Sequence, residues 1–212
     1  MKFYNIKQNS EEWNELRNGV ITGSKIGCIM ANYGKAFGEM AKKYAINLAI
    51  EQLTKNKIQS EFYNKDMQRG HAQEHLAIAL YAEYNFTEVS KGGFFSNGVV
   101  GCSPDGLVDD DGLIEIKSVI PTTHYANMKR KNVDPAYKWQ FYFNLYFTNR
   151  TWIDFVSYCD NYQEDKKLFI HRLHKEDLSN EFEIMNARIN EFIVYVEKIK
   201  QKIIESKTDN YN

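Results

Sequence analysis

Apolar and polar positions alternate with the period of an α-helix in several parts of the chain. Ser10, followed by Glu11 and Glu12, predicts a helix start, because serine can cap a first turn and acidic side chains suit the positive end of the helix dipole. We expect this helix to end near Gly19. Further helices are predicted for a short segment beginning near Thr22 or Ser24, for Glu39 to Lys55, for Met67 to Tyr84, for Pro135 to Phe147 and for a long amphipathic segment at about 180–206.

Between Val89 and Val119 the pattern changes to short apolar runs separated by Gly, Asn and Asp, which is typical of strands. The segment 109–112 has the composition of a turn, so the runs on either side of it should form a hairpin. The predicted strands are Gly93 to Phe95, Val99 to Gly101, Leu107 to Val108, Leu113 to Lys117, Thr151 to Ser157 and Leu168 to Leu173. We therefore expect a single domain over residues 1–212 of the α/β or α+β class, with helices flanking a central mixed sheet.

The composition is that of a chain that can fold around a core. Of the 212 residues, 43% are hydrophobic, and only 3 are Pro and 12 Gly, which excludes disordered and collagen-like chains. No segment approaches the roughly 18 to 20 apolar residues of a membrane helix, and the N-terminus lacks the apolar stretch of a signal peptide. Cys28, Cys102 and Cys159 form neither a CxxC site nor a disulfide framework. We expect a soluble protein of the cytoplasm.

The net charge constrains any interpretation that involves DNA. Lys and Arg total 27 against 28 Asp and Glu, which gives a net charge of −1. A protein that grips DNA over a large open face usually carries a strong positive excess. A function in DNA processing must therefore explain how a nearly neutral chain holds its substrate.

Three residues form the most informative group for chemistry. Asp105 lies in a Ser-Pro-Asp-Gly segment, and Glu115 and Lys117 follow it in a predicted strand, where both point to one face while Ile114 and Ile116 point to the other. The predicted hairpin can fold Asp105 alongside Glu115. Paired carboxylates are costly unless a cation neutralises them, and oxygen ligands favour Mg²⁺ or Mn²⁺. Lys117 could then orient or deprotonate an attacking water, or screen charge on a phosphoryl oxygen.

Other interpretations stay open at this point. An Asp in such a turn is common, and an exposed strand often carries Glu and Lys. Glu74, on the preceding predicted helix, could complete or orient a metal site or could lie on a solvated helix face. His71, Glu74 and His75 match the H-x-x-E-H pattern of inverted zinc peptidases. A zinc site needs a third protein ligand that the sequence does not single out, so ordinary surface histidines are the alternative.

Five motifs occur in order between residues 8 and 158. They are Gln8 to Trp13 with Leu16 to Ser24, Arg69 to Glu74, Ser103 to Gly106, Glu115 to Lys117, and Tyr137 to Gln140. This order resembles the λ exonuclease-like, YqaJ-type phage recombination nucleases of the PD-(D/E)xK superfamily. The first motif is similar to the W-x-x-x-R-x-G-x-I-T-A-S form of that family, with Gly23 in place of the usual alanine. Tyr142 stands where many members carry a second glutamine.

The resemblance implies a restriction-endonuclease-like core and a metal-dependent 5′-to-3′ exonuclease, which degrades one strand of duplex DNA from an end and leaves a 3′ overhang for recombination. Asp105 and Glu115 would bind Mg²⁺ or Mn²⁺, with the Ile116 carbonyl as a backbone ligand and Glu74 in support. Lys117 would position the nucleophilic water. The remaining catalytic residue by this resemblance is Gln140, which would orient the water or the substrate.

The resemblance also implies a pocket for the terminal 5′ phosphate, formed by Arg17, Thr22 and Ser24. A guanidinium and hydroxyls suit phosphate oxygens through charge-assisted hydrogen bonds. Without the resemblance, Arg17 would be interpreted as a surface residue of an amphipathic helix.

Several members of the family are ring-shaped trimers that thread DNA, and such a ring would reconcile DNA processing with a net charge of −1. The channel would then need only local basic residues. The candidates, each of which could equally belong to a solvated face, are Lys35, Lys42, Lys43, Lys129, Arg130 and Lys131. The family further implies a partner, a single-strand annealing protein that receives the overhang.

Three alternatives to the exonuclease remain. An endonuclease of the same superfamily would share the carboxylates and the lysine but would not depend on a DNA end. A DNA-end binding module would bind without cleaving. A zinc peptidase would hold its metal through His71 and His75.

Overall fold

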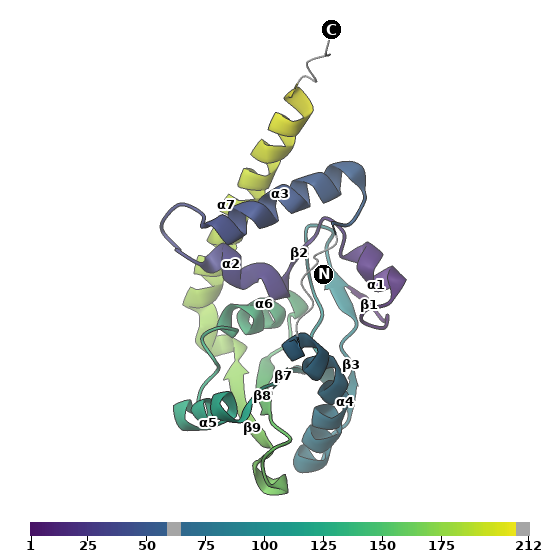
Figure 1. Ribbon diagram of the computed structural model, residues 1–212, viewed down its shortest axis with the longest axis vertical. Helices are drawn as coiled ribbons and strands as arrows, with labels where there is room; N and C mark the ends of the chain where they lie inside the picture. Colours follow the sequence, from purple (N-terminus) through teal and green to yellow (C-terminus); the bar gives the residue numbers. More distant parts are fainter. Residues whose placement is uncertain (59–64, 207–212) are drawn as a thin grey trace.

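The computed structural model describes residues 1–58 and 65–206, which form two β-sheets surrounded by helices (Figure 1). The helices are α1 (Glu11–Leu16), α2 (Ile26–Met30), α3 (Glu39–Thr54), α4 (Lys65–Asn85), α5 (Pro121–Arg130), α6 (Lys138–Thr148) and α7 (Ser179–Glu205). The strands are β1 (Lys2–Tyr4), β2 (Ile21–Thr22), β3 (Val89–Lys91), β4 (Phe94–Ser96), β5 (Val100–Cys102), β6 (Gly106–Val108), β7 (Gly112–Ser118), β8 (Trp152–Tyr158) and β9 (Leu168–His174). Short 3₁₀ turns are η1 (Gly23–Lys25), η2 (Glu164–Lys166) and η3 (Lys175–Leu178).

The sequence predicts one central mixed sheet, whereas the structure has two mixed sheets. The larger sheet has the strand order β3-β6-β7-β8-β9, in which β7 and β8 run parallel and the other neighbours antiparallel. The smaller sheet has the order β1-β4-β5-β2, with β2 parallel to β5. The second sheet arises because the N-terminal strands pair with β4 and β5, which are about eighty or more positions away along the chain.

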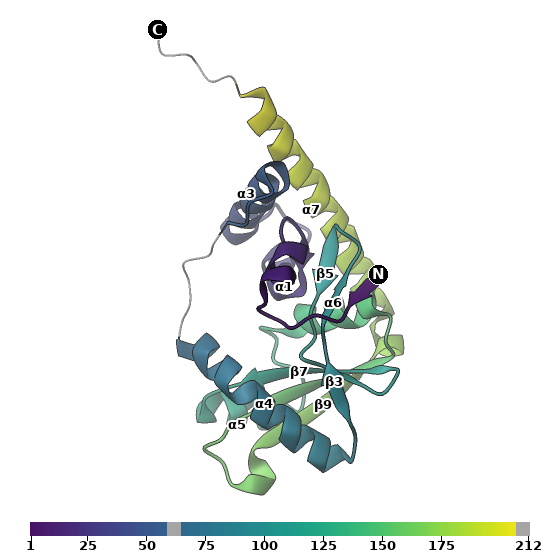
Figure 2. The same cartoon turned by 90° about the vertical axis from the view of Figure 1, so that its right-hand side faces the viewer.

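Helices cover both faces of the larger sheet, and Figure 2 shows α4 crossing one of them. On that face Ile114 and Ile116 of β7 pack in a buried cluster with Ala77 and Tyr81 of α4. On the opposite face Leu113 of β7 belongs to the main core, together with buried residues of α3, α6 and α7. The expected polar face of β7 is therefore not open to solvent, because α6 packs over it, and Glu115 is only 2% exposed.

The strongly periodic helices lie where the pattern predicts them. The Ser10 side chain accepts a hydrogen bond from the Trp13 backbone N–H at 3.2 Å, and α1 ends before Gly19, which has a positive φ of 69°. The pattern does not predict α5, which has few apolar residues, or the three-residue strands β1 and β3. In the described ranges no helix is both long and apolar enough to cross a bilayer.

The buried carboxylate of Asp154 links the larger sheet to α4. The carboxylate of Asp154, on β8, is 1% exposed and accepts hydrogen bonds from Arg172 Nε and Nη2, each at 2.8 Å, and from the Tyr81 hydroxyl at 2.6 Å. The Arg172 guanidinium also stacks on Trp152, with its Cζ atom 3.5 Å from the ring centre. A buried carboxylate is tolerated only when such partners compensate its charge.

We expect Arg172→Leu to lower the free energy of unfolding by about 2 to 3 kcal/mol, because it leaves the buried Asp154 carboxylate without its cation. Chemical denaturation at neutral pH measures the change. The double variant with Asp154→Asn removes the stranded charge and should regain part of the loss. A double variant that loses the sum of the two single effects would contradict this account.

Candidate active site

The hairpin formed by β6 and β7 brings Asp105 against the strand that carries Glu115. Gly106 pairs with Ile114 across the hairpin, and the backbone N–H of Asp105 donates to the Ile114 carbonyl at 3.1 Å. The backbone N–H of Ile116 in turn donates to Asp105 Oδ2 at 2.6 Å. The structure thus places Asp105 beside Glu115, in the arrangement that the sequence predicts for a hairpin.

Three side chains donate hydrogen bonds to the carboxylate of Glu115. Its Oε1 accepts from Lys117 Nζ at 2.8 Å and from Gln140 Nε2 at 2.5 Å. Its Oε2 accepts from Asn144 Nδ2 at 2.8 Å. Lys117 Nζ also lies 3.2 Å from Gln140 Oε1, to which it donates. Glu115 is therefore a buried charge whose two oxygens are both held.

One face of α6 supplies the partners of Glu115 and Lys117. Gln140 and Asn144 are four residues apart, and Tyr137 comes three residues before Gln140, so all three lie on the same side of the helix. Lys117 Nζ lies 4.9 Å from the centre of the Tyr137 ring. The motifs in the sequence do not single out Asn144, although its spacing from Gln140 is a signal that could have identified it.

The site has an excess of buried negative charge. Burial and the neighbouring Glu115 raise the pKa of Asp105 well above its ordinary value, against the opposing effect of Lys117. Burial also raises the pKa of Glu74 on α4, although the nearby His71 acts in the other direction. Burial alone would lower the pKa of Lys117, but Glu115 and Asp105 outweigh it, so the pKa is raised and the ammonium stays charged.

This donor set fits a hard divalent cation. Two carboxylates share one ammonium in a buried place, and oxygen donors are the ligands that Mg²⁺ and Mn²⁺ prefer. Within residues 1–58 and 65–206, no three His, Cys, Asp or Glu side chains converge closely enough to form a complete metal cage. Two carboxylates completed by backbone, water and substrate oxygens are the usual arrangement for Mg²⁺, which rarely has an all-protein cage.

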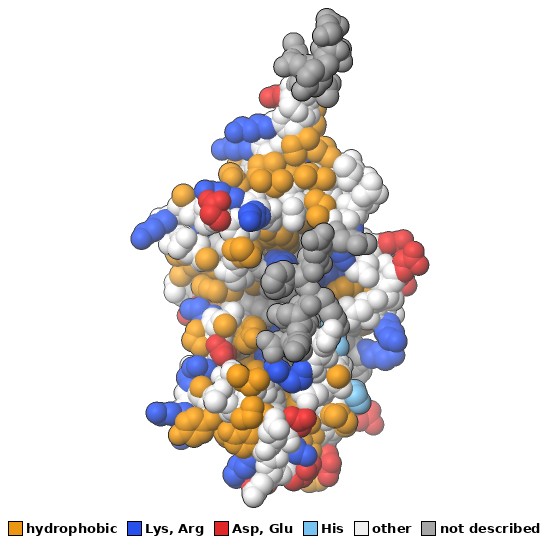
Figure 3. Space-filling model, in the orientation of Figure 1, with side chains coloured by type: hydrophobic (Ala, Val, Ile, Leu, Met, Phe, Trp, Pro, Cys, Tyr) orange, Lys and Arg blue, Asp and Glu red, His pale blue; other side chains and the backbone are white. Residues whose placement is uncertain are grey.

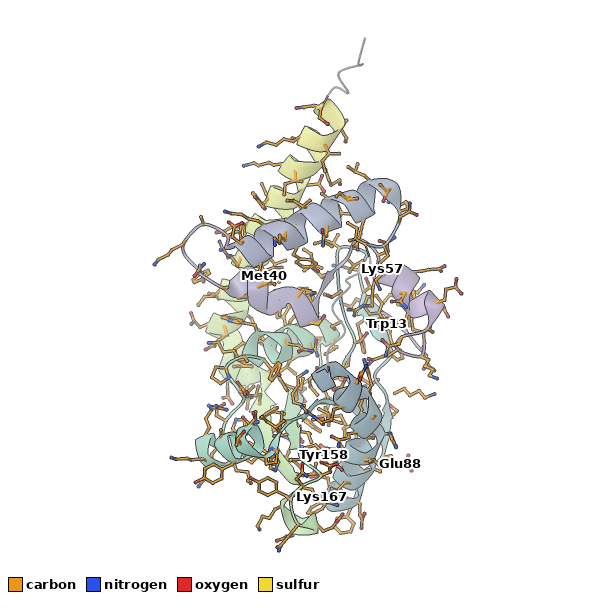
Figure 4. All side chains as sticks on the ribbon, viewed as in Figure 1. Trp13, Met40, Lys57, Glu88, Tyr158 and Lys167 are labelled. Carbon is orange, nitrogen blue, oxygen red and sulfur yellow. The ribbon has the colours of Figure 1, made fainter. Side chains whose placement is uncertain are left out.

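A second polar cluster surrounds Trp13. The Cζ atom of Arg17 lies 4.0 Å from the centre of the Trp13 ring, and Lys57 Nζ lies 5.7 Å from it. Figure 4 labels Trp13 and Lys57. In the described part of the chain the Arg17 guanidinium has no hydrogen bond or ion pair, and burial lowers its pKa to about 10. Burial and the charge of Arg17 also lower the pKa of Lys57. The sequence motifs do not single out Lys57 as a residue of this cluster. Two adjacent cations of this kind attract an anion.

The Trp13 cluster is tied to the hairpin that carries Asp105. Trp13 Nε1 donates to Ser103 Oγ at 2.8 Å, and Gln8 Nε2 donates to the Pro104 carbonyl at 2.9 Å. The N-terminal segment therefore contacts the two residues that precede Asp105. These contacts lie about ninety positions apart in sequence and are not visible in any local pattern.

The hydroxyls of Thr22 and Ser24 approach the same region from the smaller sheet. Because β2 runs parallel to β5, the two strands end on the same side of the smaller sheet. Thr22 ends β2 there, and the chain continues from the end of β5 to Asp105. Thr22 Oγ1 and Ser24 Oγ are 3.4 Å apart. The Tyr44 hydroxyl accepts a hydrogen bond from the Thr22 backbone N–H at 3.1 Å and interacts electrostatically with Arg17. Tyr44 thus links Thr22 with Arg17, and Ser24 is joined to them only through the Thr22 hydroxyl.

The two histidines of the H-x-x-E-H pattern lie on α4 beside a cleft of about 960 Å³. Glu74 and Asp105 also line this cleft, so it reaches the buried carboxylates from the surface. Because no three candidate ligands converge in the described residues, the structure offers no third ligand for a zinc ion at His71 and His75. The zinc-peptidase interpretation loses its support.

The other predicted positions do not gather at the site. Lys42 and Lys43 lie on α3, and residues 129–131 lie at the end of α5, which Figure 1 shows well apart from α3 along the long axis. Lys42 pairs with Glu39 at 2.7 Å, and basic and acidic side chains are interspersed on the visible face (Figure 3). Tyr142, in the position expected for a second glutamine, packs edge-on against Trp139. On the face that Figure 3 shows, the described basic side chains therefore do not form one continuous stripe.

Comparison with known proteins identifies the family. A family model described as a YqaJ-like viral recombinase domain matches residues 12–151. The alkaline exonuclease LHK-Exo from Laribacter hongkongensis is 32% identical, with 92% of this chain and 99% of that chain covered and a TM-score of 0.76; its complex with dAMP gives 0.77 at the same identity and coverage. A phage-related exonuclease from Haemophilus somnus 129PT is 18% identical, with coverages of 90% and 97% and a TM-score of 0.65, and shares the fold. No curated protein matches the chain.

These comparisons confirm the expected α+β fold of the PD-(D/E)xK type. The matched residues 12–151 include both polar clusters and every motif on which the resemblance in the sequence rests, except the first residues of the N-terminal motif. The family model matches more than half of the chain, and an alkaline exonuclease that is 32% identical aligns over nearly its whole length. The chain therefore belongs to the YqaJ-like viral recombinase domain family.

Proposed function

We propose that this protein is a metal-dependent exonuclease that degrades the 5′-ended strand of linear double-stranded DNA and leaves 3′ single-stranded overhangs for recombination. The observation that carries the proposal is the group that Asp105 and Lys117 form around the buried Glu115 carboxylate, with Arg17 stacked on Trp13, whose indole N–H donates to Ser103, two residues before Asp105. The family and its alkaline exonuclease relatives support nuclease chemistry.

The residues of the hairpin and of α6 have distinct roles in this proposal. Asp105, Glu115 and the Ile116 carbonyl would hold Mg²⁺ or Mn²⁺, whose chemistry is to polarise the scissile phosphate and acidify a bound water. Lys117, protonated and anchored on Glu115, would orient the attacking water and screen the developing charge. Gln140 contacts both Glu115 and Lys117 and would fix their geometry.

Supporting roles fall to Glu74 and to the cleft beside it. Glu74 interacts electrostatically with Glu115 and Lys117 and would adjust the charge of the site from α4. The cleft of about 960 Å³ that reaches Asp105 would admit the strand that is cleaved.

The polarity of digestion would come from the Trp13 cluster. The Arg17 guanidinium is partly buried and has no paired anion among the described residues, and a terminal 5′ phosphate would supply one. Thr22 and Ser24 would donate hydrogen bonds from their hydroxyls, and Lys57 would add a second positive charge. A terminal phosphate held here would place the strand so that the next phosphodiester reaches Asp105.

Assembly into a ring would explain how a nearly neutral chain retains DNA. A net charge of −1 gives a single chain little overall attraction for DNA, so we propose a ring-shaped homotrimer that retains DNA by enclosing it, lined by local lysines such as Lys35 and Lys43. The 3′ overhang would pass to a single-strand annealing protein as partner.

Digestion of linear duplex DNA tests the proposal. The substrate is labelled separately at each end, with or without a 5′ phosphate, and incubated in Mg²⁺ or in chelator beside a closed circular control. We expect metal-dependent loss from 5′ ends alone. Cutting of the circle would show an endonuclease, and binding of ends without any cleavage would show a binding module.

Asp105→Ala and Lys117→Ala should each lower the digestion rate by roughly 10²-fold to 10³-fold or more, because each removes a group that acts on the transition state. The matched control is Asp165→Ala, which removes an exposed carboxylate of η2 and should leave the rate unchanged. Unchanged digestion by either active-site variant would contradict the assignment of that residue.

Arg17→Met should reduce the preference for 5′-phosphorylated over 5′-hydroxyl ends by roughly 10-fold or more, because a charge-assisted hydrogen bond to the phosphate is lost. Initial rates on the two substrates give the ratio directly. Glu15→Ala, an exposed change on the same helix, serves as the control. Equal losses on both substrates would exclude Arg17 as the phosphate-binding residue.

Asp105→Asn should raise the midpoint of thermal unfolding in chelator, even though it abolishes cleavage. The raised pKa of Asp105 means that the folded state disfavours the ionised carboxylate, so its contribution to stability falls as pH rises above the unfolded-state pKa. The gain should vanish below about pH 4, where Asp105 is protonated in both states, and should grow as pH rises from there toward the raised pKa of Asp105. A lower midpoint at neutral pH would refute this view of the site.

A further inference from the structure

Gly23 brings the phosphate-pocket loop, residues 22–24, close against helix α6. A Cβ atom built on Gly23 would lie 2.7 Å from Asn144 Oδ1 and 3.2 Å from Phe143 Cδ1, well inside ordinary contact distances. The backbone of Gly23 is not in the left-handed region, so its conformation does not require glycine. Only the close approach to Asn144 and Phe143 does.

The Asn144 amide has its oxygen toward Gly23 and its nitrogen on the Glu115 carboxylate. Its Nδ2 donates to Glu115 Oε2 at 2.8 Å, and the residue is 1% exposed. One buried side chain therefore lies between the loop that carries Thr22 and Ser24 and the carboxylate that would bind the metal.

The surroundings of Asn144 limit how it can respond to pressure from the loop. Its neighbours on α6, Phe143 and Leu145, are fully buried in the core, so the helix cannot easily withdraw. The amide is the movable end of the side chain. A methyl group at position 23 would therefore be accommodated by turning the amide away from Glu115.

We propose that Asn144 is a positioning residue that fixes Glu115 relative to the 22–24 loop, and that glycine at position 23 is what allows it to do so. This inference rests on the proposed function. In that function the 5′ phosphate is held at one end of the Asn144 contact and the scissile phosphate at the other. Asn144 then sets the spacing between end recognition and cleavage.

A double-variant cycle tests the coupling. Gly23→Ala adds a methyl without touching a catalytic group, and Asn144→Ser removes the donor to Glu115 while leaving space for that methyl. The matched control is Gly27→Ala, four residues along the chain, where a Cβ meets no atom within 4 Å. Two quantities are measured on each full-length variant, namely Mn²⁺ binding by electron paramagnetic resonance and the digestion rate on 5′-phosphorylated linear duplex DNA.

We expect each single variant to weaken Mn²⁺ binding and to slow digestion by roughly 10-fold, the usual effect of removing a partner of a metal-binding side chain. The double variant should be no worse than Asn144→Ser, and Gly27→Ala should match the wild type. Losses that multiply in the double variant, or a Gly23→Ala protein with wild-type Mn²⁺ binding, would overturn the proposal.

Thermal unfolding in chelator shows whether each variant folds. If Gly23→Ala does not fold, rescue of folding in the double variant supports the contact, and an unfolded double variant overturns it. The test of the proposed function is separate. A wild-type protein that digests no DNA would refute that function, while Mn²⁺ binding by the four variants would still decide the role of Asn144.

Discussion

The buried carboxylate of Glu115 is the constraint on which the rest of the site depends. A charge with 2% exposure must be compensated within the protein, and here Lys117, Gln140 and Asn144 provide the donors. Two of these donors come from α6, so this helix must pack directly on β7. The parallel pairing of β7 and β8 makes this packing feasible, because a parallel pair needs a long connection, and α6 lies in that connection.

The negative charge of the site is only partly compensated by Lys117, and this excess of negative charge suits the site to binding a cation. Asp105 and Glu74 lie within electrostatic reach of Glu115, and one ammonium cannot neutralise three carboxyl groups. The Trp13 cluster has the opposite imbalance, because Arg17 and Lys57 lie close together and no anion among the described residues pairs with the guanidinium. Glu51 offsets the charge of Lys57 only in part, since the pKa of Lys57 is still lowered. A DNA end with its phosphates, together with a divalent cation, would relieve both. The close approach of Gly23 to Asn144 places the 22–24 loop against a side chain that holds Glu115.

Local signals in the sequence were sufficient for part of this picture. Asp105 and Glu115 are joined by a short hairpin, so turn composition and strand alternation predict their proximity. Asn144 and Lys57 could not be found in this way, because their roles depend on α6 packing on β7 and on a Trp13 contact that spans forty-four positions. The smaller sheet was missed for the same reason, since β1 and β2 gain their partners only through long-range pairing. The motif usually has alanine at position 23, and the glycine found there is explained by the close approach of Asn144, which the sequence alone does not reveal.

The most direct measurement is a crystal structure of the protein with Mn²⁺ and a 5′-phosphorylated duplex, in which anomalous scattering locates the ion. The account predicts Mn²⁺ bound to Asp105 and Glu115, with the terminal phosphate against Arg17. An ion bound by other residues, or a DNA end seated away from the Trp13 cluster, would contradict it.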